Sequence, residues 1–207
     1  MTQIKSITLG ELGNNCYLIT DQASGLSALV DCTDDSKEMR DFIGSAKLEY
    51  ILLTHGHFDH CMGLEEVYDA TGATVYMSHA DLTTDIGNGM FGNEDFELDP
   101  PDDTVFVREG DVIEAGSLTF DVLETPGHTP GGITYRCEDC LFTGDTLFRM
   151  SCGRYDFPGS SSLDLGHSLE KLRDLPGDYE VYPGHEGSTS LEYERRFNPY
   201  MLRPWDL

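Results

Sequence analysis

The segment Thr54-His55-Gly56-His57-Phe58-Asp59-His60 contains three histidines and an aspartate within six residues, directly after the apolar run 50–54. Gly56 lets the chain turn sharply, and histidines one residue apart in an extended segment point the same way, so His55 and His57 can bind one ion. Asp59 and His60 begin the next turn and can face a neighbouring position. A cluster of this density at the end of a buried strand predicts a metal site in a cleft.

Three later segments repeat the order of strand, tight glycine turn and ligand-type residue. They are 126–132 with His128, 143–146 with Asp145, and 183–187 with His185. A single histidine in such a turn is more often a surface residue, so the prediction depends on the repetition.

Together these segments supply seven candidate metal ligands. One catalytic zinc binds about four ligands including an open position, so seven side chains fit two ions that share a carboxylate. Nitrogen and oxygen ligands without a thiolate suit zinc, iron or manganese. We expect two divalent metal ions, zinc in the first place, with iron or manganese as alternatives. The candidate ligands are His55, His57, Asp59, His60, His128, Asp145 and His185.

The rest of the sequence forms two batches of predicted strands, each closed by predicted helices. This order predicts an α+β architecture in which two mixed sheets pack face to face with helices on their outer faces. A chain of 207 residues fits a single domain over residues 1–207. Residues 87–103 are predicted as a loop whose tip, Met90-Phe91, either covers a substrate or belongs to an unstructured insertion. The expected strands are 4–9, 16–20, 26–32, 50–54, 74–77, 104–107, 112–113, 118–124, 133–136, 141–143 and 179–182, and the expected helices are 34–46, 62–70, 80–86, 163–175 and 190–197.

The chain carries 13 Lys and Arg against 38 Asp and Glu, which gives a formal net charge of −25. Such a surface repels phosphate groups, so we expect neither a nucleic acid nor an anionic membrane as partner. No apolar run approaches the roughly 20 residues of a membrane helix. The start, Met1–Ser6, lacks a signal-peptide core, so a cytoplasmic location is predicted. The sequence makes no prediction of the oligomeric state.

Six cysteines in a chain of this length do not make a disulfide framework. Cys137-Glu138-Asp139-Cys140 is a single C-x-x-C pair, whereas structural zinc sites need a second pair or histidines at set spacing. We therefore predict that Glu138 and Asp139 form the turn between two strands.

The order H-x-H-x-D-H at 55–60, followed by a later His, Asp and His, resembles the metallo-β-lactamase superfamily, and within it hydrolases of the glyoxalase II type. The resemblance extends from Asn14–Tyr17 to Asn198–Tyr200. It implies an αββα sandwich with the metals at one end of both sheets. It also implies a distribution of the ligands: His55, His57 and His128 on the first metal, Asp59, His60 and His185 on the second, and Asp145 between the two.

By the same resemblance, a hydroxide held between two metal ions attacks the acyl carbon of a small-molecule thioester such as S-D-lactoylglutathione. Asp59 is the expected catalytic residue, which orients this nucleophile. Arg154 lies where the family often has a basic residue near the thiol part of the substrate, and Arg149 is nearby. Either arginine pairs with a substrate carboxylate or belongs to a structural ion pair in a very acidic protein.

Other branches of the superfamily fit less well. Asp145 argues against true β-lactamases, His57 argues against flavodiiron proteins, and the length leaves no room for the inserted domain of the nucleases. A mononuclear iron persulfide dioxygenase shares the ligands and a segment like 148–157, but the segment 191–200 resembles short glyoxalase II-like proteins, which favours hydrolysis. The resemblance implies a helical domain that helps longer enzymes bind glutathione, and we expect no counterpart of it in this sequence, whose last residue is Leu207. A lactone or another ester is therefore an alternative substrate, and a non-catalytic metal-binding protein is disfavoured by the complete ligand set.

Overall fold

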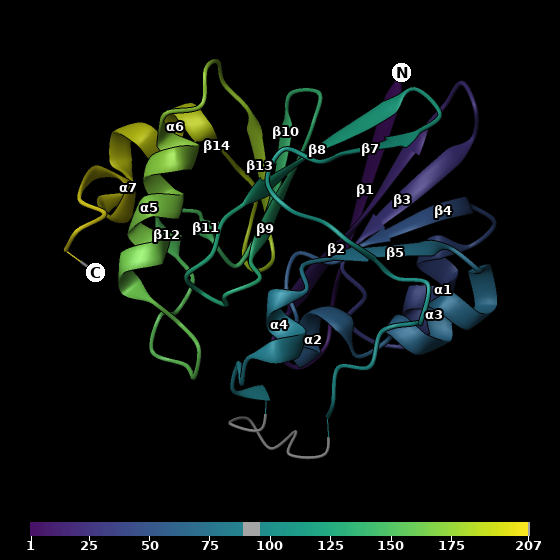
Figure 1. Cartoon of the computed structure of the whole chain (residues 1–207). Helices are drawn as coiled ribbons and strands as arrows, with labels where there is room; N and C mark the ends of the chain where they lie inside the picture. The colour runs from purple at the N-terminus through teal and green to yellow at the C-terminus, as the bar shows by residue number, and fades with distance from the viewer. Residues whose placement is uncertain (89–95, 207) are drawn as a thin grey trace.

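Two six-stranded sheets pack face to face in the computed structural model, which describes residues 1–88 and 96–206 (Figure 1). Both sheets mix parallel and antiparallel pairs, as the sequence predicted. The first sheet has the order β1 (Thr2–Leu9), β2 (Asn14–Asp21), β3 (Leu26–Val30), β4 (Lys47–Leu52), β5 (Thr74–Met77) and β6 (Val105–Phe106). The second has the order β14 (Thr189–Ser190), β13 (Glu180–Pro183), β10 (Cys140–Gly144), β9 (Ile133–Cys137), β8 (Leu118–Glu124) and β7 (Val112–Ala115).

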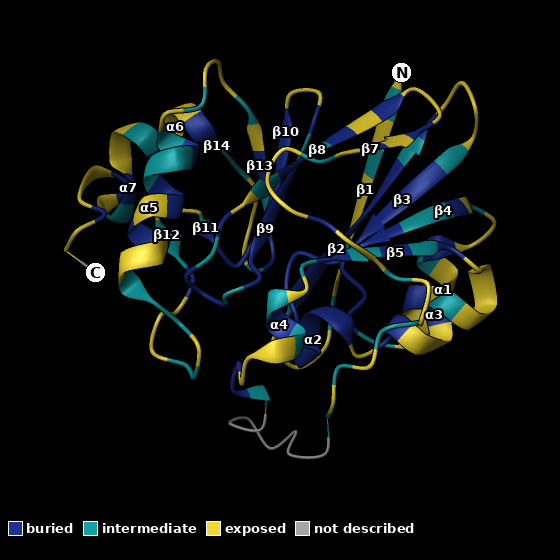
Figure 2. Ribbon diagram, in the orientation of Figure 1, coloured by how far each residue is buried: buried dark blue, intermediate teal, exposed yellow. Residues whose placement is uncertain are grey.

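Helices cover the outer face of each sheet, so the predicted α+β sandwich is confirmed (Figure 1). One apolar core lies between the sheets, and its largest fully buried side chains include Phe120, Tyr135 and Phe142. One further apolar core lies between the first sheet and its helices, and another lies between the second sheet and its helices. The central strands are the most buried parts of the fold (Figure 2). None of the helices in 1–88 and 96–206 is long and apolar enough to cross a lipid bilayer. The helices are α1 (Lys37–Ile43), α2 (Phe58–Cys61), α3 (Leu64–Thr71), α4 (Ala80–Thr83), α5 (Ser162–Arg173), α6 (Leu191–Phe197) and α7 (Pro199–Leu202).

Three predicted helices have the wrong extent, and the one expected over 80–86 is limited to the four residues of α4. The helix expected over 34–46 is limited to α1, because the Ser36 side chain caps its start and Gly44, with φ 55°, ends it. The helix expected over 62–70 begins only at Leu64, as α3, and Gly63 lies between it and the preceding short helix α2. A Cβ at Gly63 would lie 2.2 Å from the carbonyl oxygen of Asp34, so close backbone packing explains the break.

Five elements were not predicted: α2, α7, the edge strand β14, and the strands β11 (Leu147–Phe148) and β12 (Ser151–Cys152), which form a separate hairpin. The hairpin belongs to neither large sheet. By contrast, Cys137 and Cys140 face each other across the turn between β9 and β10, so the predicted turn is confirmed. The tip of the predicted 87–103 loop, Met90-Phe91, lies outside the described residues.

The strand directions bring the candidate ligands to one edge of the sandwich. In the second sheet, β8 and β10 are both antiparallel to β9, and β13 is parallel to β10, so β8, β10 and β13 end at the same edge. The segment after β4 joins this edge from the first sheet, because Ile133 N–H donates to the carbonyl oxygen of Thr54 at 2.8 Å. Four separate loops therefore meet at the strand ends.

Candidate metal centre

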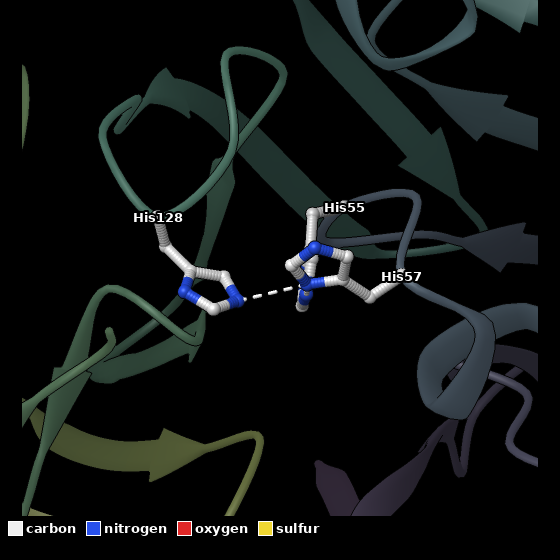
Figure 3. Close-up of side chains that lie close together, drawn as sticks. All are labelled: His55, His57 and His128. Atoms are coloured by element: carbon white, nitrogen blue, oxygen red, sulfur yellow. Dashed lines mark hydrogen bonds between the residues drawn. The ribbon is translucent and has the colours of Figure 1, made fainter. Parts of the chain in front are cut away.

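Three histidines from two loops meet at this edge of the sandwich (Figure 3). His55 Nε2 lies 3.1 Å from His57 Nδ1, and His57 Nδ1 lies 2.9 Å from His128 Nε2. All three residues are buried, with exposed fractions of 8% or less. Burial lowers the pKa of each imidazole, that of His128 to about 4, so the rings are neutral near pH 7.

The outer hydrogen bonds of these rings fix where each proton lies. His57 Nε2–H donates to the carbonyl oxygen of Ile86 and His128 Nδ1–H donates to that of Arg154, each at 2.8 Å. The hydroxyl of Thr54 donates to a carboxylate, so it accepts from His55 Nδ1–H at 3.1 Å. Three unprotonated nitrogens therefore point at one another, which is unfavourable without a cation between them. This geometry fits a metal ion with three imidazole ligands.

A second group of side chains lies beside the first. His185 Nε2 is 3.2 Å from Asp59 Oδ2, and His60 Nε2 is 3.7 Å from the same oxygen. Asp145 touches both groups, because its Oδ2 lies 3.4 Å from His128 Nε2 and 3.5 Å from His185 Nε2. The arrangement brings together all the candidate ligands, with Asp145 in the bridging position that the resemblance implied.

Two polar atoms in the middle of this group lack a hydrogen-bond partner although they are buried. They are His60 Nε2 and Asp145 Oδ1, which lie 3.3 Å apart. Burial lowers the pKa of His60, but the neighbouring carboxylates of Asp59, Asp145 and Asp31 outweigh it and hold that pKa well above the usual range. The site thus favours a positive charge at this point. A second divalent cation would satisfy both atoms, so the donor set fits two ions.

Asp31 positions His60 and was missed by the sequence analysis. Its carboxylate accepts hydrogen bonds from His60 Nδ1–H at 2.8 Å, from Thr54 N–H at 2.8 Å and from the Thr54 hydroxyl at 2.9 Å. These bonds hold a proton on His60 Nδ1, so Nε2 is the nitrogen that points at the site and could bind a cation there. A carboxylate directly after the apolar run of β3 was the available signal, but it lies outside the four glycine turns.

Asp81 joins the two loops that carry the histidines, and no sequence signal marked it. It is buried in α4 and accepts from Gly56 N–H at 2.8 Å, from the Thr129 hydroxyl at 2.9 Å and from Gly131 N–H at 2.6 Å. Burial raises the pKa of Asp81, and these three donors oppose the shift. The carboxylate therefore holds the backbone of the His55–His57 loop against that of the His128 loop.

Asp81→Asn is expected to weaken metal binding about 10- to 100-fold, because the amide group of Asn turns a donor toward backbone N–H groups. Competition with a chromophoric chelator measures the change in zinc affinity. Asp69→Asn is the matched control, since Asp69 is an exposed carboxylate on α3. Native zinc affinity in Asp81→Asn would show that the two loops hold their positions without this carboxylate.

A cavity of about 340 Å³ opens beside the metal-type residues. Its walls combine polar groups with the apolar side chains of Leu12, Phe58, Phe148 and Phe157. The Phe157 ring lies edge-on to the rings of His57 and His128, with centroids 5.5 Å and 5.7 Å apart. This cavity is where a substrate would meet the candidate ions.

The two predicted substrate-binding arginines have different positions. Arg154 lines the cavity, but its guanidinium donates two hydrogen bonds of 2.8 Å to Asp156 and lies 4.3 Å from the centre of the Phe157 ring. Arg149 is exposed at the turn between β11 and β12 and is not one of the described residues that line the cavity. Substrate binding by either residue stays a prediction.

Comparison with known proteins agrees with this α+β sandwich and its His-rich edge. A sequence profile of the metallo-beta-lactamase superfamily matches residues 9–185. A hydroxyacylglutathione hydrolase of Rhodopseudomonas palustris is 36% identical over 177 residues, which cover 84% of this chain and 63% of that relative. The chain belongs to the metallo-beta-lactamase superfamily.

Two solved structures have the same fold over nearly their whole length. The crystal structure of BLEG-1 B3 metallo-beta-lactamase superposes with a TM-score of 0.85 and 29% identity, covering 96% of this chain and 99% of that chain. The crystal structure of TTHA1623 in a di-iron-bound form superposes with a TM-score of 0.81 and 33% identity, covering 95% and 99%.

Proposed function

We propose that this protein is a metal-dependent hydrolase that cleaves a hydroxyacylglutathione-like thioester. The observation that carries the proposal is the meeting of two ligand groups at Asp145, next to a cavity large enough for a small acyl group. The similarity to a hydroxyacylglutathione hydrolase supports the substrate class. Water and a thioester would give a carboxylic acid and a free thiol.

The first ion would be held by His55, His57 and His128, and the second by Asp59, His60 and His185, with Asp145 shared. Zinc is the proposed metal, with iron or manganese as alternatives. When bound, such ions supply the Lewis acidity that activates water and polarises an acyl carbonyl near neutral pH.

The protein's own residues orient the reactants. Asp59 lies in the cavity wall with an exposed fraction of 8%, so its carboxylate can accept a hydrogen bond from the attacking water and hold its proton. Burial raises the pKa of Asp59, but His60 and His185 outweigh this and lower it, which keeps the carboxylate ionised. Phe157 excludes bulk water from one side of the imidazole cluster.

Thiol release from S-D-lactoylglutathione by the metal-loaded protein tests this proposal. We expect turnover that Asp59→Ala abolishes, measured by the colour of a disulfide thiol reagent. Oxygen uptake with glutathione persulfide and hydrolysis of a β-lactam serve as comparison reactions. The absence of thiol release from fully loaded protein would contradict the thioesterase assignment. Turnover of glutathione persulfide or of the β-lactam, without turnover of the thioester, would also contradict it.

The net charge of −25 should oppose the approach of an anionic thioester. Arg154 is the only Lys or Arg among the described residues that line the cavity, and it is already paired with Asp156. We expect kcat/KM for S-D-lactoylglutathione to rise severalfold between roughly 10 mM and 150 mM salt, because screening weakens the repulsion. A neutral N-acetylcysteamine thioester is the control and should change little. A fall in kcat/KM with salt would instead show a locally attractive field at the cavity.

A further inference from the structure

The β11–β12 hairpin forms one wall of the cavity, although it belongs to neither large sheet. Phe148, Ser151 and Cys152 from this hairpin line the cavity, and the Phe148 ring lies edge-on to His185 with centroids 5.9 Å apart. None of its four strand residues is a candidate metal ligand. The hairpin is therefore placed to contact substrate without holding the metals.

The hairpin is poorly suited to hold its own shape. Each strand has only two residues, and an isolated two-stranded hairpin is at best marginally stable. Its two-residue turn is Arg149-Met150, in which only Met150 has a positive φ, at 60°. This sign pattern is that of a type II turn, whereas tight hairpins favour the primed turns that match the twist of the strands. Its position must therefore depend on contacts from outside.

Those contacts come from two buried side chains at α6. Glu194 and Asn198 both have exposed fractions of 0%. Glu194 accepts hydrogen bonds from Met150 N–H at 2.8 Å, from the Thr189 hydroxyl at 2.7 Å and from Asn198 Nδ2 at 2.9 Å. The Asn198 amide also donates to the carbonyl oxygens of Ser151 at 2.9 Å and Phe148 at 3.3 Å.

The helix that carries this pair is itself fixed to the second sheet. Leu191 is fully buried in the core beneath α5, and the Arg195 guanidinium donates to the carbonyl oxygen of Arg173 at 2.7 Å and to that of Gly177 at 2.6 Å. A buried carboxylate is costly unless it is hydrogen-bonded, and its three donors here are neutral groups. Glu194 thus links a rigid helix to a hairpin that cannot hold itself.

We propose that Glu194 and Asn198 are positioning residues, which hold the β11–β12 hairpin as the substrate-binding wall and thereby set the affinity for substrate. The consequence for catalysis rests on the proposed hydrolase function. The positioning of the hairpin does not depend on that function. The effect on catalysis and the positioning of the hairpin are therefore tested by separate measurements.

Three variants test the proposal in the metal-loaded protein. Glu194→Ala removes the acceptor for Met150 N–H. Asn198→Ser removes the amide but keeps a residue that can cap α7, as the Asn198 side chain does now through Tyr200 N–H. Glu194→Gln is the conservative variant, because its carbonyl oxygen can still accept from Met150 N–H while its amide faces the Thr189 hydroxyl. Glu192→Ala, an exposed position on the same helix, is the control.

We expect Glu194→Ala and Asn198→Ser to raise KM for the thioester about tenfold with kcat within about twofold of the native value. Metal content should stay at the native level, and Glu194→Gln should restore KM. Unchanged KM in folded Glu194→Ala and Asn198→Ser, or a loss of kcat and metal that matches the rise in KM, would overturn the proposal. Circular dichroism establishes which variants are folded, and if Glu194→Ala unfolds, Asn198→Ser and Glu194→Gln decide.

The rate at which Cys152 reacts with a thiol reagent reports on how firmly the β11–β12 hairpin is held in place. This rate can be measured without any substrate. Cys152 is half-buried in β12, whereas the other five cysteines are buried. Mass spectrometry identifies the labelled residue. We expect Glu194→Ala and Asn198→Ser to accelerate labelling of Cys152 about tenfold, with Glu194→Gln at the native rate. Native labelling rates in all variants would refute the positioning role, even if thioester hydrolysis fails in the native protein.

Discussion

Asp145→Asn is expected to lower kcat/KM for a thioester about 10³-fold or more, on the order of 4 kcal/mol of transition-state stabilisation. Asp145 is the side chain that joins the two ligand groups, with Oδ1 3.3 Å from His60 Nε2 and Oδ2 between His128 and His185. An amide has no negative charge and turns a donor toward one of the unprotonated imidazole nitrogens. Metal content should fall together with activity.

Asp139→Asn provides the control for this substitution, because Asp139 is an exposed carboxylate at the other end of β10. It should keep native activity and metal content. Near-native turnover in Asp145→Asn with two ions still bound would contradict the bridging role.

Removal of metal is expected to lower the melting temperature by roughly 8–16 °C. A ligand at a thousand times its Kd stabilises the folded state by about 4 kcal/mol, and a chain of this size shifts by about 2–4 °C per kcal/mol. The physical source is the repulsion between the unprotonated nitrogens of His55, His57 and His128, which only a cation relieves. Differential scanning calorimetry before and after dialysis against a chelator measures the shift.

Re-addition of zinc should restore the melting temperature, whereas calcium should not, since calcium prefers oxygen ligands. The shift should be smaller in Asp145→Asn. A melting temperature that is the same with and without chelator would show that the histidine cluster is stable without an ion.

The sequence predicted which side chains meet at the strand ends, because the chemistry of candidate ligands is local. His55, His57, Asp59 and His60 are neighbours in the chain, and each later ligand stands beside a glycine turn at a strand end. The two batches of strands likewise predicted the sheets. The strand pairing that brings the ends of β8, β10 and β13 to one edge could not be predicted from the sequence, because strand direction depends on contacts between residues far apart in the chain.

The supporting residues were missed for the same reason. Asp31 and Asp81 act only through groups 23 to 50 residues away, such as Thr54 and Gly131. Glu194 looked like one more acidic residue on a helix in a very acidic chain, and its burial depends on the hairpin that folds over it. The break at Gly63 likewise follows from contact with Asp34, which no local propensity reveals.

Anomalous diffraction from a crystal of protein purified without added metal tests the central claim most directly. Data collected at the absorption edges of zinc, iron and manganese identify the ions and their positions. We predict two peaks, one among His55, His57 and His128 and one among Asp59, His60 and His185, with Asp145 between them. A map with no peak at the strand ends, or with ions bound elsewhere on the acidic surface, would contradict the account.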